Sequence, residues 1–409
     1  MSSVENFIDQ CPSHTNLTDS SLFRKIEACA ENLHAIELDQ LDIQLAASPL
    51  TTYNAVLALK LAKSKIAISK LDKNIHITFL FAVYKETERL SFAYETPLGE
   101  DCLNEKVRQI EWLVEGLSNV TWDLLIVDDG CPDNSGLKAQ EIANRSAYRD
   151  QIKILFLQEA INANSSLIGQ LKSTTDSQKG GAILYGLRYA ASLKRKNNII
   201  LYTDADLSSH LGMAGLLAEA IVNDHKSLAI GSRREKTCFT LRSEFRDHRG
   251  KLFIYLRRRL LHPINYISDE QCGFKAFDAL FLDNFLENVL ETKFSFDVEL
   301  LLRTELKKPA SIAQIPIAWM DSDEASTTKD LEPYVPMLNR MVDFYEHYLP
   351  SNPEAEDFKS FIRDLTDETW DALIHHIPDA IKTWDPISDI QFNEVTTDEL
   401  RMCANLSDK

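Results

Sequence analysis

The pattern of apolar residues changes twice along this chain of 409 residues. Residues 1–72 place leucine and isoleucine at helical spacing, which predicts a helical N-terminal extension of two or three helices. From Ile75 short apolar runs alternate with segments long enough for helices, and near the C-terminus the spacing becomes helical again. We therefore predict a central domain at 73–330 and a helical C-terminal extension at 331–409.

The apolar runs of the central domain have strand character, and the segments between them have room for crossover helices. This alternation predicts an α/β fold of Rossmann-like type, with a mostly parallel sheet flanked by helices. An Asn-, Ser- and Thr-rich stretch at 158–177 predicts a flexible loop. The predicted strands are 76–83, 122–127, 152–157, 198–203 and 228–231, and the predicted crossover helices include 106–117 and 181–193.

Composition narrows the class of protein. A hydrophobic content of 44% with 26% charged residues is ordinary for a globular protein with a sizeable core. The net charge of −18 argues against general nucleic-acid binding. Seven scattered cysteines without C-x-x-C spacing indicate reduced thiols, and neither a secretory signal nor a transmembrane segment is visible. These features predict a cytoplasmic protein.

Two carboxylates, Asp204 and Asp206, follow the fourth predicted strand. Open α/β sheets bind their ligands at the carboxyl ends of strands. Carboxylates two residues apart at such an edge can share Mg²⁺ or Mn²⁺, and such a cation typically neutralises a diphosphate. A lone Asp-x-Asp more often lies in a solvated turn, so the neighbouring motifs decide its meaning.

Polar side chains also follow the first two strands. Tyr84 and Glu86 place an aromatic ring and a carboxylate after the first strand. Asp128 and Asp129 close the second strand before a glycine, where they can accept hydrogen bonds from a nucleobase or a ribose. Each pair taken singly is more typical of a turn without a ligand.

Two further segments carry candidate chemistry. Lys179 begins a Gly-rich helix entry, Lys-Gly-Gly-Ala, whose amides and ammonium suit a phosphate, although the P-loop pattern is absent. Asp-Glu-Gln-Cys-Gly-Phe-Lys at 269–275 and Phe-Asp-Val-Glu-Leu-Leu at 296–301 supply carboxylates near a Gly turn and at a helix start.

In this order the motifs resemble those of the inverting nucleotide-sugar glycosyltransferases of family 2, which have the GT-A fold. The resemblance covers about residues 75–325 and is strongest to the polyprenyl-phosphate branch, the dolichyl-phosphate glucosyltransferases and mannose synthases. The motifs at 269–275 and 296–301 are the most specific. The others lie at 82–86, 127–131, 179–182, 204–206 and 231–233.

The resemblance implies transfer of a hexose from a nucleotide-sugar, with UDP-glucose favoured, to an acceptor such as a polyprenyl phosphate. Asp269 is the first candidate for the carboxylate that faces the acceptor, and Glu270 is the second. A hydroxyl acceptor would need such a general base, whereas a phosphate is already anionic. The residues carried over to the nucleotide-sugar site are Tyr84, Glu86, Asp128, Asp129, Lys179, Asp204 and Arg233.

The resemblance also implies a divalent cation, Mg²⁺ or Mn²⁺, held by Asp204 and Asp206. Mannose synthases place a glutamine ligand two residues after the motif, where this chain has Ser208. His210 is then the candidate substitute ligand.

A basic stretch, residues 231–261, stands out in an acidic chain. It contains ten Lys and Arg residues against three acidic ones. A solvated helix face is one interpretation, and a site for an anionic acceptor or a membrane surface is the other. The membrane-anchoring N-terminal helix of the eukaryotic glucosyltransferases is absent from this sequence, so we expect at most a peripheral membrane association. The C-terminal part, with 14 acidic against 5 basic residues from Asn352 on, is interpreted as a solvated face.

Other functions remain open at this point. The chain could transfer sugar to a soluble hydroxyl acceptor, or serve as a catalytically silent binding or scaffold protein with a GT-A fold. A GT-A-like nucleotidyltransferase is disfavoured, because no Gly-rich basic loop follows the first strand.

Overall fold

The computed structural model describes residues 3–33, 38–321 and 333–406, which divide into two compact units. The predicted N-terminal extension falls in the same unit as the sheet. The predicted boundary at 330 lies outside the described residues. The first unit comprises residues 1–241, 272–293 and 310–327, and the second comprises 242–271, 294–309 and 328–409.

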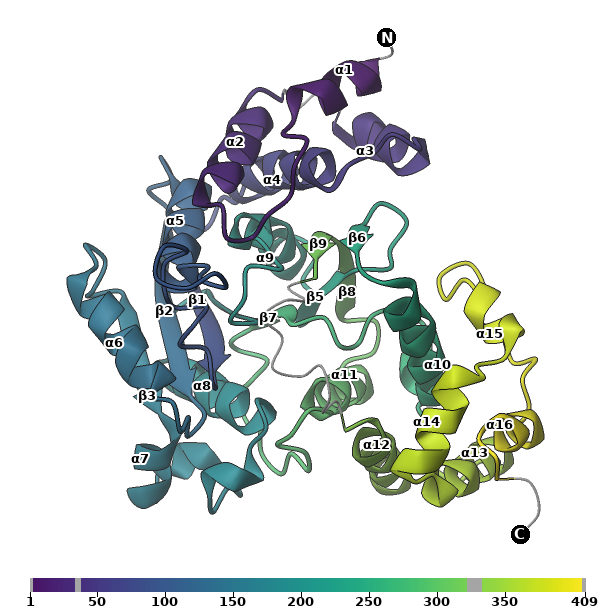
Figure 1. Ribbon diagram of the computed structural model, residues 1–409. Coiled ribbons are helices and arrows are strands. Elements are labelled where there is room, and N and C mark those ends of the chain that lie inside the picture. The colour runs from purple at the N-terminus through teal and green to yellow at the C-terminus, as the bar shows by residue number, and fades with distance from the viewer. Residues whose placement is uncertain (1–2, 34–37, 322–332, 407–409) are drawn as a thin grey trace. The chain divides into compact units, whose positions relative to one another are not determined.

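The first unit is built on a seven-stranded sheet of order β3-β2-β1-β4-β7-β5-β8 (Figure 1). β7 pairs antiparallel with β4 and β5, and the remaining pairs are parallel. The predicted α/β fold with a mostly parallel sheet is therefore confirmed. The strands are β1 (Ile75–Val83), β2 (Val120–Asp128), β3 (Ile152–Phe156), β4 (Asn198–Thr203), β5 (Leu228–Ser232), β7 (Phe274–Asp278) and β8 (Ile312–Pro316), and a small parallel pair joins β6 (Phe239–Leu241) to β9 (Ala318–Met320).

Helices cover both faces of this sheet because its central strands bury both sets of alternating side chains. Phe79 and Phe81 of β1 join a large buried cluster with the N-terminal helices and with α5 and α9. Leu80 points the other way, where it lies against Gly186 of α8 so closely that a side chain there would clash. The helices of this unit are α1 (Ser3–Gln10), α2 (Ser20–Glu31), α3 (Leu38–Ala47), α4 (Tyr53–Ser69), α5 (Cys102–Val114), α6 (Ser135–Arg145), α7 (Leu157–Asn162), α8 (Gly180–Ser192) and α9 (Ala214–Val222).

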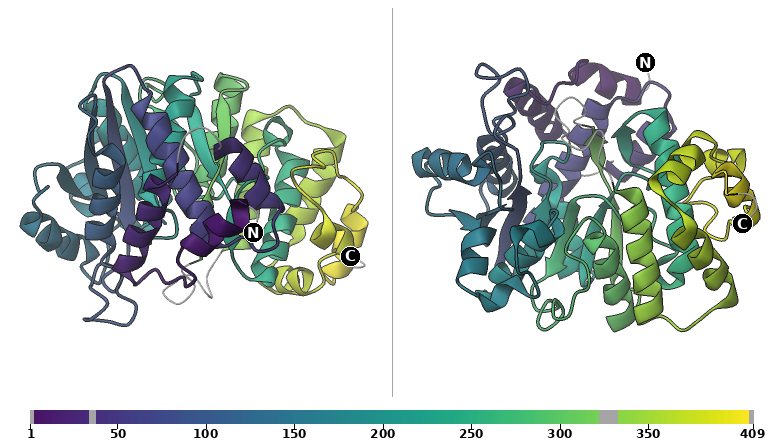
Figure 2. Two further views of the ribbon diagram at one scale, coloured as in Figure 1. Left: turned by 90° about the horizontal axis from the view of Figure 1, so that it is seen from above. Right: turned by 60° about the horizontal axis from the view of Figure 1, so that its bottom comes forward.

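The N-terminal helices are an integral part of the first unit (Figure 2). α4 packs between α2 and α9 and buries nearly all of its residues. Its Lys60 is 1% exposed and donates to both oxygens of Asp42 on α3, at 2.8 and 2.9 Å. This ion pair joins two helices of the extension, and the same ammonium donates to the Thr237 hydroxyl at 2.9 Å, which ties the extension to the domain.

The stretch 158–177 differs from the predicted flexible loop. It includes most of α7 and two short 3₁₀ turns, at Ser166–Ile168 and Thr174–Asp176. The polar residues act as caps here: the Ser173 hydroxyl and the Asp176 carboxylate form a capping box.

The second unit is helical in its described part. Its longest helix, α10, brings most of the basic stretch against the C-terminal helices, which pack on it. Its helices are α10 (Glu244–Leu260), α11 (Phe296–Lys307), α12 (Tyr334–Tyr348), α13 (Pro353–Asp364), α14 (Asp367–His375), α15 (Asp379–Thr383) and α16 (Thr397–Cys403).

Candidate active site

The carboxyl ends of β1, β2 and β4 meet at one edge of the sheet. Val83 of β1 lies beside Asp128 of β2 in register, and the Asp129 amide donates to the Val83 carbonyl at 3.1 Å. β4 flanks β1 on its other side and delivers Asp204 at its end. The predicted nucleotide-sugar residues of the first two strands and the Asp-x-Asp motif therefore share this edge.

The Asp128 carboxylate accepts hydrogen bonds from backbone amides of the segment that follows it. One of its oxygens accepts the amides of Gly130 and Cys131, each at 3.0 Å, and the other accepts the amide of Gly136 at 2.8 Å. A Cβ at Gly136 would lie 2.6 Å from this carboxylate, so the contact requires glycine. Asp128 thus orders the turn from which Asp129 projects.

Asp129 is left with an unused buried acceptor. Its Oδ2 atom accepts the Lys179 amide at 2.8 Å, whereas its Oδ1 atom is buried and accepts no hydrogen bond from the described part of the chain. Burial raises the pKa of Asp129 to about 6, against the lowering effects of the Ser177 side chain and the Lys179 amide. A buried orphan acceptor requires an explanation, and a ligand hydroxyl or ring N–H would satisfy it.

Lys179 connects Asp129 with Asp204. Its backbone has φ 68° and ψ −51°, and the Gly180 amide donates to the Gln178 carbonyl at 2.8 Å, which makes a γ-turn of the rare, strained type. Its ammonium pairs with the Asp204 carboxylate. Strain of this kind is found at functional sites, where the surrounding structure maintains it.

Asp204 is surrounded by positive charge. Burial by itself would raise its pKa, but the ammonium of Lys179, with Arg233 and Lys106, holds the pKa below its ordinary value. The Asp204 amide donates to the Gly273 carbonyl at 3.1 Å, and a Cβ at Gly273 would lie 2.2 Å from the carboxylate. Asp204 is therefore ionised, and its pocket wall tolerates only glycine.

Residues that sequence reasoning missed hold the segment just after Asp204. Lys106 of α5 is fully buried and donates to the Asp206 carbonyl at 2.6 Å. Glu100 accepts the Leu207 amide at 3.0 Å. A signal existed for Lys106, because it occupies a position on the apolar face of its helix with Leu103.

Glu86 lies in the same electrostatic environment. Arg89 donates to it at 2.7 Å and lies 3.5 Å from Glu100. Burial raises the pKa of Glu86, although Arg89 opposes this effect, and the charges of Asp206 and Asp204 raise it further. Tyr84 is 47% exposed, so its ring is available at the same edge.

Comparison with known proteins shows which proteins this chain resembles. No family model matches the chain. A dolichyl-phosphate beta-glucosyltransferase of Trichomonas vaginalis is 24% identical over 251 residues, which are 60% of this chain and 64% of that protein. Those of Saccharomyces cerevisiae and Drosophila melanogaster are 27% and 25% identical and cover 62% of this chain, with 69% and 70% of their own lengths matched. The chain is similar to the dolichyl-phosphate glucosyltransferase branch of glycosyltransferase family 2.

The family 2 relatives in that branch are matched over about two thirds of their own length. A solved structure, glucosyl-3-phosphoglycerate synthase from Mycobacterium tuberculosis in complex with phosphoglyceric acid, aligns with a TM-score of 0.44 at 14% identity, covering 71% of this chain and 85% of that one. Likeness at that level supports no conclusion about function. In the described residues, no helix is both long and apolar enough to cross a membrane.

The prediction that His210 is a metal ligand is wrong. The side chain is fully buried, its Nδ1 atom accepts the Gly212 amide at 3.0 Å, and its Nε2 atom lies 3.1 Å from Glu27. The ring packs edge-on against Phe23 and Trp112. Nδ1 is bonded to the backbone of its own loop and Nε2 lies buried beside the Glu27 carboxylate, so the imidazole serves the fold.

Asp204 and Asp206 are then the candidate cation ligands. The described residues contain no group of three or more His, Cys, Asp and Glu side chains arranged to hold a metal. Mg²⁺ is usually bound by one or two carboxylates together with substrate phosphates. Two carboxylates at this edge therefore fit a cation that arrives with a diphosphate.

In the second unit, the two candidate acceptor-side carboxylates differ. Glu270 is 1% exposed and lies 3.3 Å from Arg257, which is itself fully buried and also donates to the carbonyls of Ile264 and Ile267, both at 2.5 Å. The ion pair with Arg257 explains why a carboxylate is buried at position 270, and this explanation requires no catalytic role. Asp269, also buried, remains the candidate.

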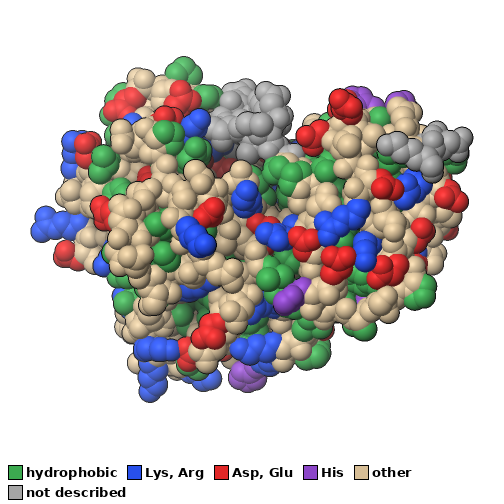
Figure 3. Space-filling model, turned by 90° about the horizontal axis from the view of Figure 1, so that it is seen from below, with side chains coloured by type: hydrophobic (Ala, Val, Ile, Leu, Met, Phe, Trp, Pro, Cys, Tyr) green, Lys and Arg blue, Asp and Glu red, His purple; other side chains and the backbone are tan. Residues whose placement is uncertain are grey.

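The basic stretch is divided between the two units: residues 231–241 belong to the first and 242–261 to the second. Within α10, Lys251 and Arg258 donate to the carbonyls of Lys382 and Pro386, and Arg259 pairs with Glu354. On the face drawn in Figure 3, Lys and Arg side chains are interspersed with Asp and Glu. Part of the basic stretch therefore anchors the acidic C-terminal helices.

Proposed function

We propose that this chain is a metal-dependent, inverting glycosyltransferase that moves a hexose from a nucleotide-sugar, in the first instance UDP-glucose, to a polyprenyl phosphate. The observation that carries the proposal is the Lys179 bridge, which joins the buried, incompletely bonded Asp129 to the ionised Asp204 at the ligand edge of the sheet. The names of the similar proteins support glucose as the sugar and a polyprenyl phosphate as the acceptor.

The residues have separate parts in the proposed reaction. Asp129 accepts a hydrogen bond from the ribose or the base, and Tyr84 and Glu86 border that site. Lys179 and Arg233 approach the diphosphate with positive charge. Asp204 and Asp206 hold Mg²⁺ or Mn²⁺, which stabilises negative charge on the leaving nucleoside diphosphate. Asp269 is the proposed carboxylate for the acceptor.

The test of the proposed function is a panel of nucleotide-sugars offered with Mg²⁺ or Mn²⁺. Release of nucleoside diphosphate is measured with polyprenyl phosphate, with a soluble hydroxyl acceptor and with no acceptor. We expect UDP-glucose with polyprenyl phosphate to give the fastest release. Preference for the hydroxyl acceptor, with turnover that depends on Asp269, would assign Asp269 as a general base. No release with any pair would favour a silent binding protein.

Asp129→Asn should stabilise the protein and weaken nucleotide binding. The ordinary carboxyl pKa is 3.8, whereas that of Asp129 is about 6. Between these two pH values the folded protein therefore keeps a proton on Asp129 that the unfolded chain has lost. Asp129 therefore lowers the free energy of unfolding as pH rises from about 4 to about 6, and the loss persists above that range, by roughly 1–3 kcal/mol.

Urea unfolding of parent and variant at pH 4 and pH 8 measures this difference, which should be small at pH 4 and favour the variant at pH 8. In a UDP titration the same variant should bind about 1–3 kcal/mol more weakly, since a charge-assisted hydrogen bond is lost. Equal pH dependence in the two proteins, together with equal UDP affinity, would leave Asp129 as an ordinary turn residue.

Metal and nucleotide should bind cooperatively. Since the proposed site holds the cation with two carboxylates, Mn²⁺ alone should bind weakly, and UDP should strengthen its binding by about tenfold or more. Titration of Mn²⁺ followed by electron paramagnetic resonance, with and without UDP, measures the coupling. Asp206→Asn should abolish most of it. Equally tight Mn²⁺ binding without UDP would point to ligands elsewhere.

Charge reversal on α10 tests the phosphate acceptor. Arg246→Glu should raise the KM for polyprenyl phosphate about fivefold while the KM for the donor stays unchanged, because one basic residue near an anionic headgroup contributes roughly 1 kcal/mol. Arg149→Glu, a reversal at an exposed position of the first unit, is the matched control. Acceptor kinetics that do not distinguish the two variants would remove α10 from the acceptor site.

A further inference from the structure

The loop that follows the Asp-x-Asp motif, residues 206–212, is fixed over its whole length. Lys106 and Glu100 hold its first two residues. Further along, the Leu211 amide donates to the Gln109 side chain of α5 at 2.8 Å. The carboxylate of Asp206 accepts the Ser208 amide at 3.1 Å, so the direction of this carboxylate depends on the conformation of the loop.

His210 sits in the middle of this loop and has one defined tautomer when neutral. Since its Nδ1 atom accepts the Gly212 amide, the proton lies on Nε2, which faces Glu27 at 3.1 Å. The ring is fully buried between Phe23 of α2 and Trp112 of α5. Its orientation is therefore set by the Gly212 amide, by these two rings and by the carboxylate of Glu27 beside Nε2.

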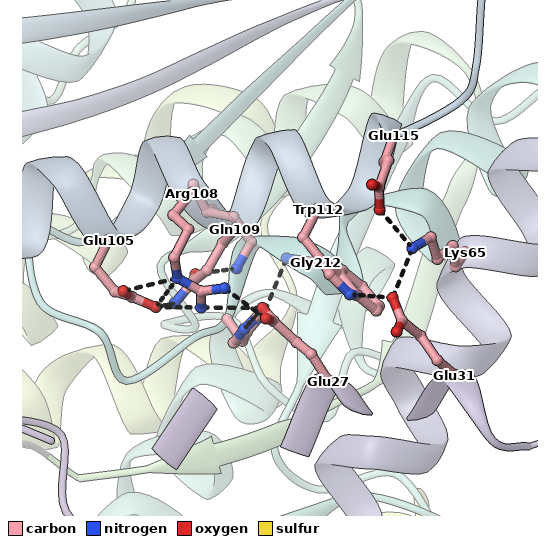
Figure 4. A network of polar contacts seen from close by, with 11 residues as sticks. Glu27, Glu31, Lys65, Glu105, Arg108, Gln109, Trp112, Glu115 and Gly212 are labelled. Carbon is pink, nitrogen blue, oxygen red and sulfur yellow. Dashed lines mark hydrogen bonds and ion pairs between the residues drawn. The ribbon is translucent and has the colours of Figure 1, made fainter. Parts of the chain in front are cut away.

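Glu27 belongs to the N-terminal extension, far from the motif in sequence, and is 3% exposed (Figure 4). Arg108 of α5 donates to it at 3.0 Å and is held from the other side by Glu105, also at 3.0 Å. One guanidinium thus joins two buried carboxylates. A buried charge with such complete pairing is costly to disturb, and it keeps Glu27 in one position.

We infer that Glu27 is a positioning residue for the Asp-x-Asp motif: through His210 it holds the 206–212 loop in the conformation that presents Asp206. The N-terminal extension then contributes to the conformation of the proposed catalytic site. This inference rests on the proposed function for its kinetic consequence, but its structural part stands on the loop alone. Residues that orient metal ligands from behind typically contribute 10- to 100-fold to activity or metal affinity.

Glu27→Gln is the informative variant, since glutamine preserves shape and an acceptor for His210 while removing the charge. Glu31→Gln is the matched control: Glu31 lies one turn further along α2 and contacts Trp112 and Lys65, so it touches a ring that packs on His210, and neither of these two contacts is with the loop itself. Hydrogen exchange of the peptide that contains residues 205–213 measures the loop without any substrate.

We expect Glu27→Gln to unfold at nearly the parent temperature, to exchange the 207, 211 and 212 amides at least about tenfold faster, and to bind Mn²⁺ with UDP about tenfold more weakly. In the transferase assay kcat should fall by about tenfold or more, with the donor KM little changed. His210→Asn should act alike, and the double variant should be no worse than either single one.

Unchanged loop exchange in a folded Glu27→Gln protein, or equal effects in Glu31→Gln, would overturn the inference. If the parent transfers no sugar, the proposed function fails by itself, while faster exchange confined to the loop would still support the positioning role.

Discussion

Asp204→Asn is expected to lower kcat by about 10²–10³-fold while the protein stays folded. The substitution keeps the size of the side chain beside Gly273 but removes the charge that pairs with Lys179 and, in the proposal, binds the cation. Single-turnover release of UDP from UDP-glucose measures the effect, and circular dichroism checks the fold.

The matched control is Asp283→Asn, which removes an exposed carboxylate that also pairs with a lysine, Lys194. It should leave kcat unchanged. Parent-like turnover in Asp204→Asn would mean that the cluster at the sheet edge is structural, and the proposed use of the Asp-x-Asp motif would then be abandoned.

Glu270→Ala is expected to destabilise the protein by about 3–5 kcal/mol, because it leaves Arg257 charged, buried and without its counter-ion. Urea unfolding measures the loss. Glu270→Gln should cost much less, since the amide oxygen still accepts from Arg257. Near-parent kcat in folded Glu270→Gln would show that Glu270 stabilises the fold and does not act in catalysis. A large loss of kcat with unchanged stability would restore Glu270 as a catalytic candidate.

The sequence predicted the strands β1 to β5, although not β8, and the residues at the sheet edge for one physical reason. Strands buried on both faces are continuous apolar runs, such as that of β4, and the carboxyl ends of parallel strands converge. Asp129 and Asp204 could therefore be brought together before the structure was known. β7 was missed because its five residues include Lys275 and Asp278, and burial of that lysine cannot be inferred from local pattern.

The wrong prediction for His210 and the open one for Glu270 share another cause. His210 and Glu270 have side chains suited to metal binding and catalysis, and only tertiary contacts show that Glu27 and Arg257 already occupy them. The basic stretch is misleading in the same way, since composition counts Arg258 as surface charge although it lies buried over Trp384. Long-range pairing with residues elsewhere in the chain leaves no local signature.

The position of β7 in the sheet also limits where the chain can be truncated. β7 fills the place between β4 and β5, and the residue just before it supplies the carbonyl that receives the Asp204 amide. A fragment that ended ahead of Cys272 would contain both carboxylates of the Asp-x-Asp motif, yet β4 would become an open edge strand of six buried residues. Such an edge invites pairing between molecules, so this fragment would aggregate before it could bind a nucleotide.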